Sequence, residues 1–173
     1  SGVWQIILNP TRVVEGQYDL WLPSENVLNR GTGFLYPDEE VTLTIPSTAD
    51  KVISVGAYDA LTFSYASFSG RGYTWQDERT KPDLVAPGVN VRTTAVGGGV
   101  TVVSGTSFAT PFVTGASALL MEWGIVRGND PFLYGEKVKA YLRRGARELP
   151  GFGKYPNREV GYGRLCLERS LPD

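Results

Sequence analysis

Ser107 is the residue with the clearest potential for chemistry, and it lies in the stretch VSGTSFATP that spans residues 103–111. Apolar residues typical of a strand precede this serine and a helical pattern follows it, which predicts a strand-to-helix turn. The free N–H groups and the positive dipole end of a helix N-terminus favour negative charge, such as the oxyanion of acyl transfer. Pro111 has no N–H to bond the Ser107 carbonyl, which loosens the first turn. Ser107 is therefore a candidate nucleophile.

An ordinary helix cap is the other interpretation of this turn. Serine and threonine are preferred N-cap residues, so Thr106 or Ser107 could cap the helix without any chemistry. Such caps are far more frequent than serine nucleophiles. Local features by themselves leave both interpretations open.

The chain contains no histidine, which restricts how Ser107 could be activated. The stretch GTSFA at residues 105–109 nearly matches the nucleophile elbow G-x-S-x-G, but that arrangement needs a histidine after the serine. A serine–lysine mechanism of the S-x-x-K kind has no instance in the sequence. What remains is an order in which the aspartate and the histidine both precede the serine. A triad of that kind would have its acid and its base upstream of residue 1.

The elements that must position Ser107 follow from apolar spacing. Residues 52–57 form a near-continuous apolar run, which predicts a strand covered on both faces of a parallel sheet, and short strands are expected at 84–85 and 100–103. A second helix is expected over 135–144, with Lys137, Lys139 and Arg143 away from its apolar face, and a short last helix over 165–171. The helix after Ser107 has a predicted core-facing stripe of Ala109, Phe112, Val113, Ala116, Leu119, Leu120 and Trp123.

Composition and charge exclude several other functions. Seventeen basic and eighteen acidic residues give a net charge of −1, and they form no block of one sign, so neither nucleic acid nor a membrane is expected as a partner. Cys166 is the only cysteine, and without histidine a zinc site is not expected. We expect no metal and no cofactor.

Four blocks, in order, resemble the subtilisin-like serine proteases, the subtilases of peptidase family S8. These blocks are VISVGA at 52–57, KPDLVAPG at 81–88, GTSFATPFVTGA at 105–116 and GYG at 161–163. The resemblance covers residues 51 to 171 approximately. It implies that Ser107 is the nucleophile, that its backbone N–H is one oxyanion donor, and that the helix after it is the buried central helix of the family. Phe112 replaces a histidine that is frequent in the motif, and we expect this change to affect packing.

The N-terminal stretch resembles a narrower clostridial group that includes the Csp germination proteases. The residues that carry this likeness are 2–6, 15–23, 34–38 and 42–49, and Trp4, Ile6 and Leu8 alternate as in a strand. In that group a jelly-roll β-domain is inserted into the protease domain. The resemblance implies that residues 1–48 are the last strands of such an insertion. Residues 49–173 would then be the C-terminal part of an α/β catalytic domain, a parallel sheet with helices on both faces, in a secreted or spore-associated bacterial protein.

Two functions of different classes are compatible with this resemblance. One is an active serine endopeptidase that cleaves peptide or protein substrates through an acyl-enzyme, and the other is a pseudoprotease that serves as a binding or regulatory scaffold. In either case, the chain by itself is expected to be inactive because it has no base. Its expected partners are a substrate peptide and the N-terminal half of the same protease, or a second copy through exposed apolar edges.

Overall fold

The structure, a computed structural model, describes residues 2–16, 18–23, 27–72 and 80–172. The chain divides into two compact units, Ser1–Asp38 and Glu39–Asp173. Residues 39–48, which the sequence assigned to the N-terminal β-domain, belong to the second unit. The proposed domain identities stay predictions.

The first unit contains no β-strand among its described residues. Trp4, Ile6 and Leu8, whose alternation predicted a strand, are all exposed, Trp4 by 90%. A strand is stable only when another strand bonds its N–H and C=O groups and when one of its faces is buried. The described residues between 2 and 48 supply neither condition by themselves, and the jelly-roll assignment stays a prediction.

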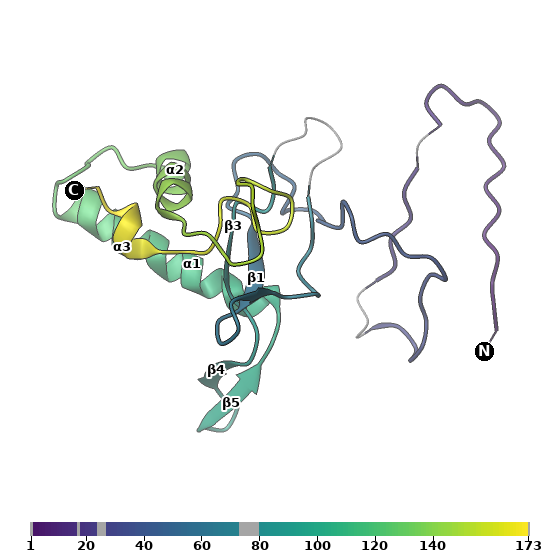
Figure 1. Ribbon diagram of the computed structural model, residues 1–173, viewed down its shortest axis with the longest axis horizontal. Coiled ribbons are helices and arrows are strands. Elements are labelled where there is room, and N and C mark those ends of the chain that lie inside the picture. Colours follow the sequence, from purple (N-terminus) through teal and green to yellow (C-terminus); the bar gives the residue numbers. More distant parts are fainter. Residues whose placement is uncertain (1, 17, 24–26, 73–79, 173) are drawn as a thin grey trace. The chain divides into compact units, whose positions relative to one another are not determined.

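A small mixed sheet that includes β1 and β3 forms the centre of the second unit (Figure 1). Its strand order is β2-β1-β3. Strand β1 (Val55–Asp59) pairs in parallel with β3 (Leu84–Pro87), from Val55 opposite Leu84 to Tyr58 opposite Pro87. Strand β2 (Ser64–Tyr65) pairs antiparallel with the end of β1. The outer edge of β3 is covered because Val85 bonds Gly163 and Leu165 through its backbone. This arrangement confirms the predicted α/β fold, with a sheet that is mixed rather than wholly parallel.

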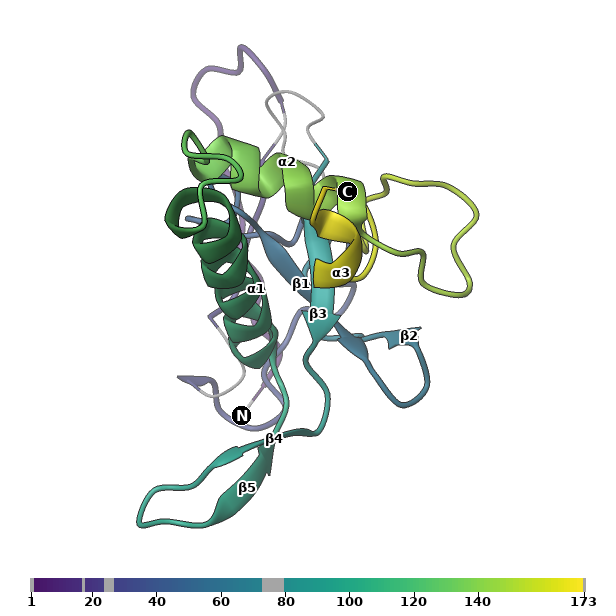
Figure 2. The ribbon, with the colours of Figure 1, turned by 90° about the vertical axis from the view of Figure 1, so that its left-hand side faces the viewer.

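Helix α1 (Thr106–Met121) packs on β1 and β3 and continues into a π-helical turn, η2 (Glu122–Val126). Strands β4 (Val91–Thr94) and β5 (Val100–Val103) form an antiparallel hairpin that leads into α1. Figure 2 shows this hairpin extending beyond the sheet and turning directly into the helix. Most of the main core lies between α1 and the sheet, with Ala57, Leu84, Ala86, Ala109, Val113, Ala116 and Leu120 among its buried members.

The predicted stripe of α1 is partly wrong. Ala109, Val113, Ala116 and Leu120 are buried as expected, but Phe112 and Leu119 are 44% and 53% exposed. A helix of period 3.6 packed on one sheet buries a narrow stripe, and these two side chains lie on the flank of that stripe. The α1 helix is therefore covered on one side only in this structure.

Two further helices complete the covered face. Helix α2 (Gly135–Gly145) matches the predicted second helix closely and packs against α1 and α3. Helix α3 (Leu167–Ser170) is shorter than the predicted segment 165–171. On the opposite face of the sheet, Tyr58 and Val85 pack with Leu149 and Val160, which come from a segment without helix.

The stretch Thr106–Val126 is long and apolar enough to cross a membrane by length and composition alone, with a mean hydropathy of 1.2. Core helices of soluble proteins pass the same test. Because Ala109, Val113 and Leu120 pack into the core against the sheet, we interpret this stretch as a core helix.

Candidate functional site

Ser107 is an exposed residue in the first turn of α1, one position after the first helical residue, Thr106. Gly105 is the N-cap, and no side chain forms a capping hydrogen bond at this end. The alternative in which Thr106 or Ser107 serves as an ordinary cap is therefore wrong. The Ser107 hydroxyl lies on the solvent side of a helix start whose backbone donors are not occupied by a side chain.

The turn before Ser107 depends on Gly105, whose backbone φ is 149° and ψ is 157°. Residues with a Cβ rarely adopt this conformation, which explains the glycine at this position. The Gly105 N–H donates to the Gly88 carbonyl at 2.8 Å, and the Gly105 carbonyl accepts from the Phe108 N–H at 3.1 Å. The turn is thus held to the end of β3 on one side and to the first turn of α1 on the other.

Gly88 lies where β1, β3 and α1 meet. Its N–H donates to the Tyr58 carbonyl at the end of β1, and its carbonyl receives the Gly105 N–H. A Cβ on Gly88 would come within 2.6 Å of the Ala57 Cβ and 3.1 Å of the Gly105 carbonyl oxygen. Only a glycine lets the Ser107 turn approach the carboxyl ends of the two parallel strands this closely.

The electrostatics of the turn favour an anion. The first turn of α1 contains no acidic residue, so the helix dipole and its free N–H groups face no competing negative side chain of their own helix. Pro111 lies inside α1 and cannot donate to the Ser107 carbonyl. Among the described residues, no hydrogen bond or ion pair joins Ser107 to an acid or a base. The arrangement can stabilise an oxyanion but cannot by itself deprotonate the serine.

A buried charged cluster surrounds Asp83, which follows Pro82 in the KPDLVAPG block. The Asp83 carboxylate is fully buried and accepts from the Ser54 N–H at 2.6 Å and the Lys81 Nζ at 3.0 Å. From α2, the Arg143 Nε donates at 2.9 Å and the Lys139 Nζ lies 3.3 Å away. This Asp83 cluster holds one carboxylate and three cations, and it joins the start of β1 to α2.

Lys139 is buried in this cluster, although the sequence placed it away from the apolar face of its helix. Its ammonium donates to the backbone carbonyls of Asp50 at 2.7 Å and Val52 at 3.0 Å. Burial lowers the pKa of Lys139, the neighbouring Asp83 raises it, and the cations Lys81 and Arg143 lower it further, so the net direction is down. The sequence placed Lys139 off the apolar face of its helix but did not predict its burial, which depends on Asp83 and on carbonyls from a distant segment.

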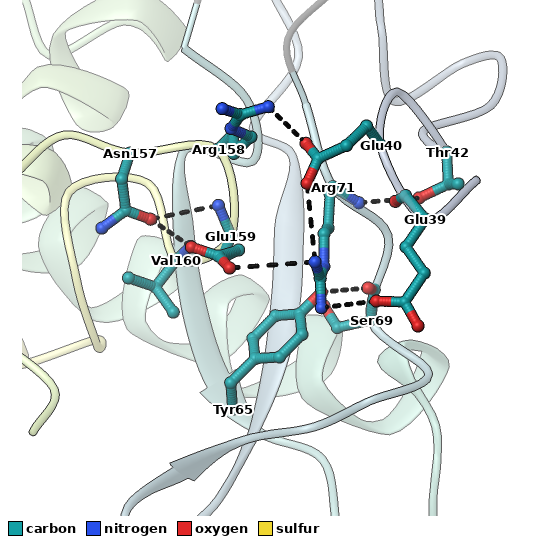
Figure 3. Close-up of polar contacts among 10 residues, drawn as sticks. All are labelled: Glu39, Glu40, Thr42, Tyr65, Ser69, Arg71, Asn157, Arg158, Glu159 and Val160. Atoms are coloured by element: carbon teal, nitrogen blue, oxygen red, sulfur yellow. Dashed lines mark hydrogen bonds and ion pairs between the residues drawn. The ribbon is translucent and has the colours of Figure 1, made fainter. Parts of the chain in front are cut away.

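A second charged cluster lies at the surface around Arg71 (Figure 3). Its guanidinium contacts Glu39 at 2.9 Å, Glu40 at 3.5 Å and Glu159 at 3.9 Å, and Arg158 contacts Glu40 at 2.6 Å. The guanidinium also lies 5.4 Å from the ring centre of Tyr65. This Arg71 cluster joins three segments that are distant in sequence, with three carboxylates and two arginines.

The backbone at Arg71 strengthens the same junction. The Thr42 N–H donates to the Arg71 carbonyl, and the Arg71 N–H donates to the Thr42 hydroxyl, both at 2.9 Å. Burial raises the pKa of Tyr65, and the nearby Arg71 partly opposes this effect. The segment 39–42 is therefore bound to the body of the second unit by backbone bonds as well as by charges.

The described residues contain no group of three acidic, cysteine or histidine side chains that could hold a metal ion. Cys166, the only cysteine in the sequence, is half-buried and forms no disulfide.

Sequence reasoning missed the Asp83 cluster. The pair Lys81 and Asp83 within one motif was a signal, but nothing in the sequence connects that pair to Lys139 and Arg143, about sixty residues away.

Comparisons of the sequence with known proteins show similarity to one family of proteases. The sequence profile of the subtilase family matches residues 35–163. The chain is 39% identical over 134 residues to the membrane-bound transcription factor site-1 protease of Mus musculus, a match that covers 75% of this chain and 12% of that protein. It is 34% identical over 156 residues to the serine protease AprX of Bacillus subtilis, covering 79% of this chain and 33% of that protein.

A comparison with solved structures also finds a protease. The CspB protease of Clostridium perfringens matches with a TM-score of 0.78 and 50% identity, over 83% of this chain and 30% of that one. This match confirms the expected likeness to the Csp group. The chain thus spans a third or less of the length of these relatives. With a profile that matches most of its residues and an identity of 50% to a solved member, the chain belongs to the subtilase family.

Proposed function

We propose that this chain carries the nucleophile of a subtilisin-like serine endopeptidase, and that Ser107 is that nucleophile. The observation that carries the proposal is the position of Ser107, exposed in the first turn of α1 and preceded by a turn that Gly105 and Gly88 hold in place. The family match includes this turn, since it extends over residues 35–163. Peptide or protein substrates follow from the family.

The proposed reaction is acyl transfer. The Ser107 Oγ would attack the scissile carbonyl as its proton passes to a histidine, and a covalent acyl-enzyme would form as the amine leaves. The backbone N–H of Ser107 would donate to the oxyanion, supported by the dipole of α1. Water would then attack the acyl-enzyme and release the second product.

The base must come from outside this chain, because the sequence contains no histidine. We infer that it belongs to a longer protein, of which this chain is the C-terminal part, since the matched part of the chain covers only 33% of AprX and 30% of the CspB protease. The exposed apolar flank of α1, with Phe112 and Leu119, is a surface that the other half of such a protein would cover. The isolated chain should then be inactive and should associate with that half or with itself.

Active-site labelling tests this proposal. We expect a fluorophosphonate probe to label the longer protein at Ser107, to fail with the S107A variant, and to fail with the isolated 173-residue chain. A heat-denatured sample of the longer protein is the control, because labelling that persists after denaturation is nonspecific. Labelling of the isolated chain would contradict the need for an external base.

A pseudoprotease is the alternative, in which the fold is kept as a binding or regulatory scaffold. Absence of labelling in the longer protein, together with a folded structure, would favour this alternative and overturn the endopeptidase proposal. The presence of a serine at position 107 favours the enzyme, because a scaffold would not need to retain it.

A further inference from the structure

Two hydrogen bonds outside the reacting atoms join the segment 88–90 to the segment 104–105. The Asn90 N–H donates to the Ser104 hydroxyl oxygen at 2.9 Å, and the Gly105 N–H donates to the Gly88 carbonyl at 2.8 Å. They lie just beyond the last paired residues of the β4–β5 hairpin, where Val91 is opposite Val103. The ladder of the hairpin is thus continued by one side-chain oxygen and one carbonyl.

At Asn90 itself the partner is a side chain rather than the backbone of the opposite strand. Asn90 has a φ of 52°, in the left-handed region, which turns its chain away from the extended path. Asparagine tolerates this conformation better than most residues, but it costs energy unless neighbouring contacts hold it. The Ser104 hydroxyl is such a contact, since it bonds the N–H of the strained residue itself.

Ser104 is three residues before Ser107, and the chain between them is the Gly105 turn. Glycine at an unusual φ gives a turn little stiffness of its own. Its direction therefore depends on what holds its two ends, which are the Ser104 and Gly105 bonds on one side and α1 on the other. Gly88 connects the turn to the sheet, because its N–H donates to the Tyr58 carbonyl at the end of β1.

We propose that Ser104 is a positioning residue for Ser107, acting through Asn90 and the Gly88–Gly105 bond. This inference rests on the proposed function, in which Ser107 is the nucleophile. Loss of the Ser104 hydroxyl releases Asn90, lets the hairpin end move relative to Gly88, and changes the direction in which the Ser107 hydroxyl and N–H point.

The test compares S104A with S104T, which keeps the hydroxyl, in the longer protein that carries this chain. For S104A we expect the rate of fluorophosphonate labelling at Ser107, and kcat on a peptide substrate, to fall about tenfold with little change in KM, since small misplacements of reacting groups can cost up to ~10²-fold. S104T should recover most of the rate.

The matched control is T42V, which removes another hydroxyl that accepts a backbone N–H, that of Arg71. This bond lies in the Arg71 cluster, outside the Ser107 turn. T42V should lower the melting temperature at least as much as S104A does, without slowing the labelling. Equal slowing by T42V and S104A would show that only general stability matters, and would overturn the proposal.

Hydrogen exchange in the same samples separates this inference from the proposed function. In S104A, the peptide containing Gly105 and Ser107 should exchange its amide hydrogens several-fold faster, and in S104T it should not. If the wild-type protein is not labelled at all but exchange accelerates in S104A, the catalytic assignment fails while the positioning contact stands. Unchanged exchange in S104A overturns the positioning proposal whatever the labelling shows.

Discussion

The Asp83 and Arg71 clusters have opposite charge ratios and opposite surroundings. Around Asp83, three cations share one carboxylate, and its side chain and those of Lys81 and Lys139 are buried. Around Arg71, three carboxylates share two arginines near the surface, where the Glu39 side chain is 73% exposed and the Arg71 side chain 22%. In water, charges of either sign are solvated and their pairing contributes little. Within the core, a charge without a partner is strongly destabilising, so the buried cations depend on the single carboxylate of Asp83.

The two clusters also differ in what they join. The Asp83 cluster connects the start of β1 to α2, and through β1 it supports the sheet on which α1 and Ser107 rest. The Arg71 cluster fastens the segment 39–42 to the outside of the same unit. We therefore expect perturbation of the first to affect the whole unit, and perturbation of the second to remain local.

The largest expected effect comes from D83N. This change leaves Lys81, Lys139 and Arg143 without their anion, and removing one partner of a buried ion pair typically costs about 3–5 kcal/mol. We expect the free energy of unfolding, measured by urea denaturation, to fall by that amount. E159Q, which neutralises a carboxylate of the Arg71 cluster, is the control and should cost less than about 1 kcal/mol. Equal losses in the two variants would contradict the comparison.

K139M should have a smaller effect, with a distinctive pH dependence. Asp83 keeps Lys81 and Arg143 in this variant, so we expect a loss of about 1–2 kcal/mol at neutral pH. Because the folded-state pKa of Lys139 is lowered from 10.5, the unfolded chain binds more protons between the two values. The contribution of Lys139 to stability should therefore rise with pH in that window, and K139M should lose this rise.

K137M is the matched control for this pH dependence. The Lys137 ammonium bonds the carboxylate of Asp130, and this hydrogen bond raises the pKa of Lys137. A raised folded-state pKa gives stability that is present below 10.5 and is lost as the pH rises through the folded value. The difference between wild type and K137M should therefore shrink at alkaline pH, opposite to K139M. The same slope in both variants would show that the burial of Lys139 has no energetic consequence.

R71Q should cost less than D83N although Arg71, like Asp83, has three charged partners. Exposed ion pairs contribute about 0.2–1 kcal/mol each and are screened by salt, and the Thr42 backbone bonds remain in the variant. We expect a loss of about 1 kcal/mol at low ionic strength that is mostly absent in 1 M NaCl, as measured by urea denaturation at both salt concentrations. A loss that persists in high salt would mean that packing on Tyr65, rather than charge, holds this cluster.

E39Q should have the smallest effect. Its carboxylate is mostly exposed and shares Arg71 with two other carboxylates, so its removal leaves the arginine paired. We expect the free energy of unfolding to change by less than about 0.5 kcal/mol, as is usual for surface substitutions. A stabilised E39Q would indicate that the excess of negative charge around Arg71 is itself unfavourable.

Local patterns predicted most helices and strands of the second unit, but not the segments against which they pack. Strand β5 and helix α2 lie where apolar spacing placed them, whereas β4 was not predicted, because its alternation is weak and it is stabilised by pairing with β5. The stripe of α1 was right at Val113 and Leu120, whose burial follows from period 3.6. It was wrong at Phe112, since a flanking position is buried only if another element covers that side.

The sequence by itself determined the family and the position of the Ser107 turn. Both depend on short-range requirements: a glycine at an unusual φ, a proline without a donor, and an apolar periodicity after the serine. The tertiary structure alone decided that Gly105 is the cap, that Lys139 is buried beside Asp83, and that Ser104 bonds Asn90. These facts depend on which distant segments meet, because burial and hydrogen bonding are set by the groups that surround a residue rather than by its own type.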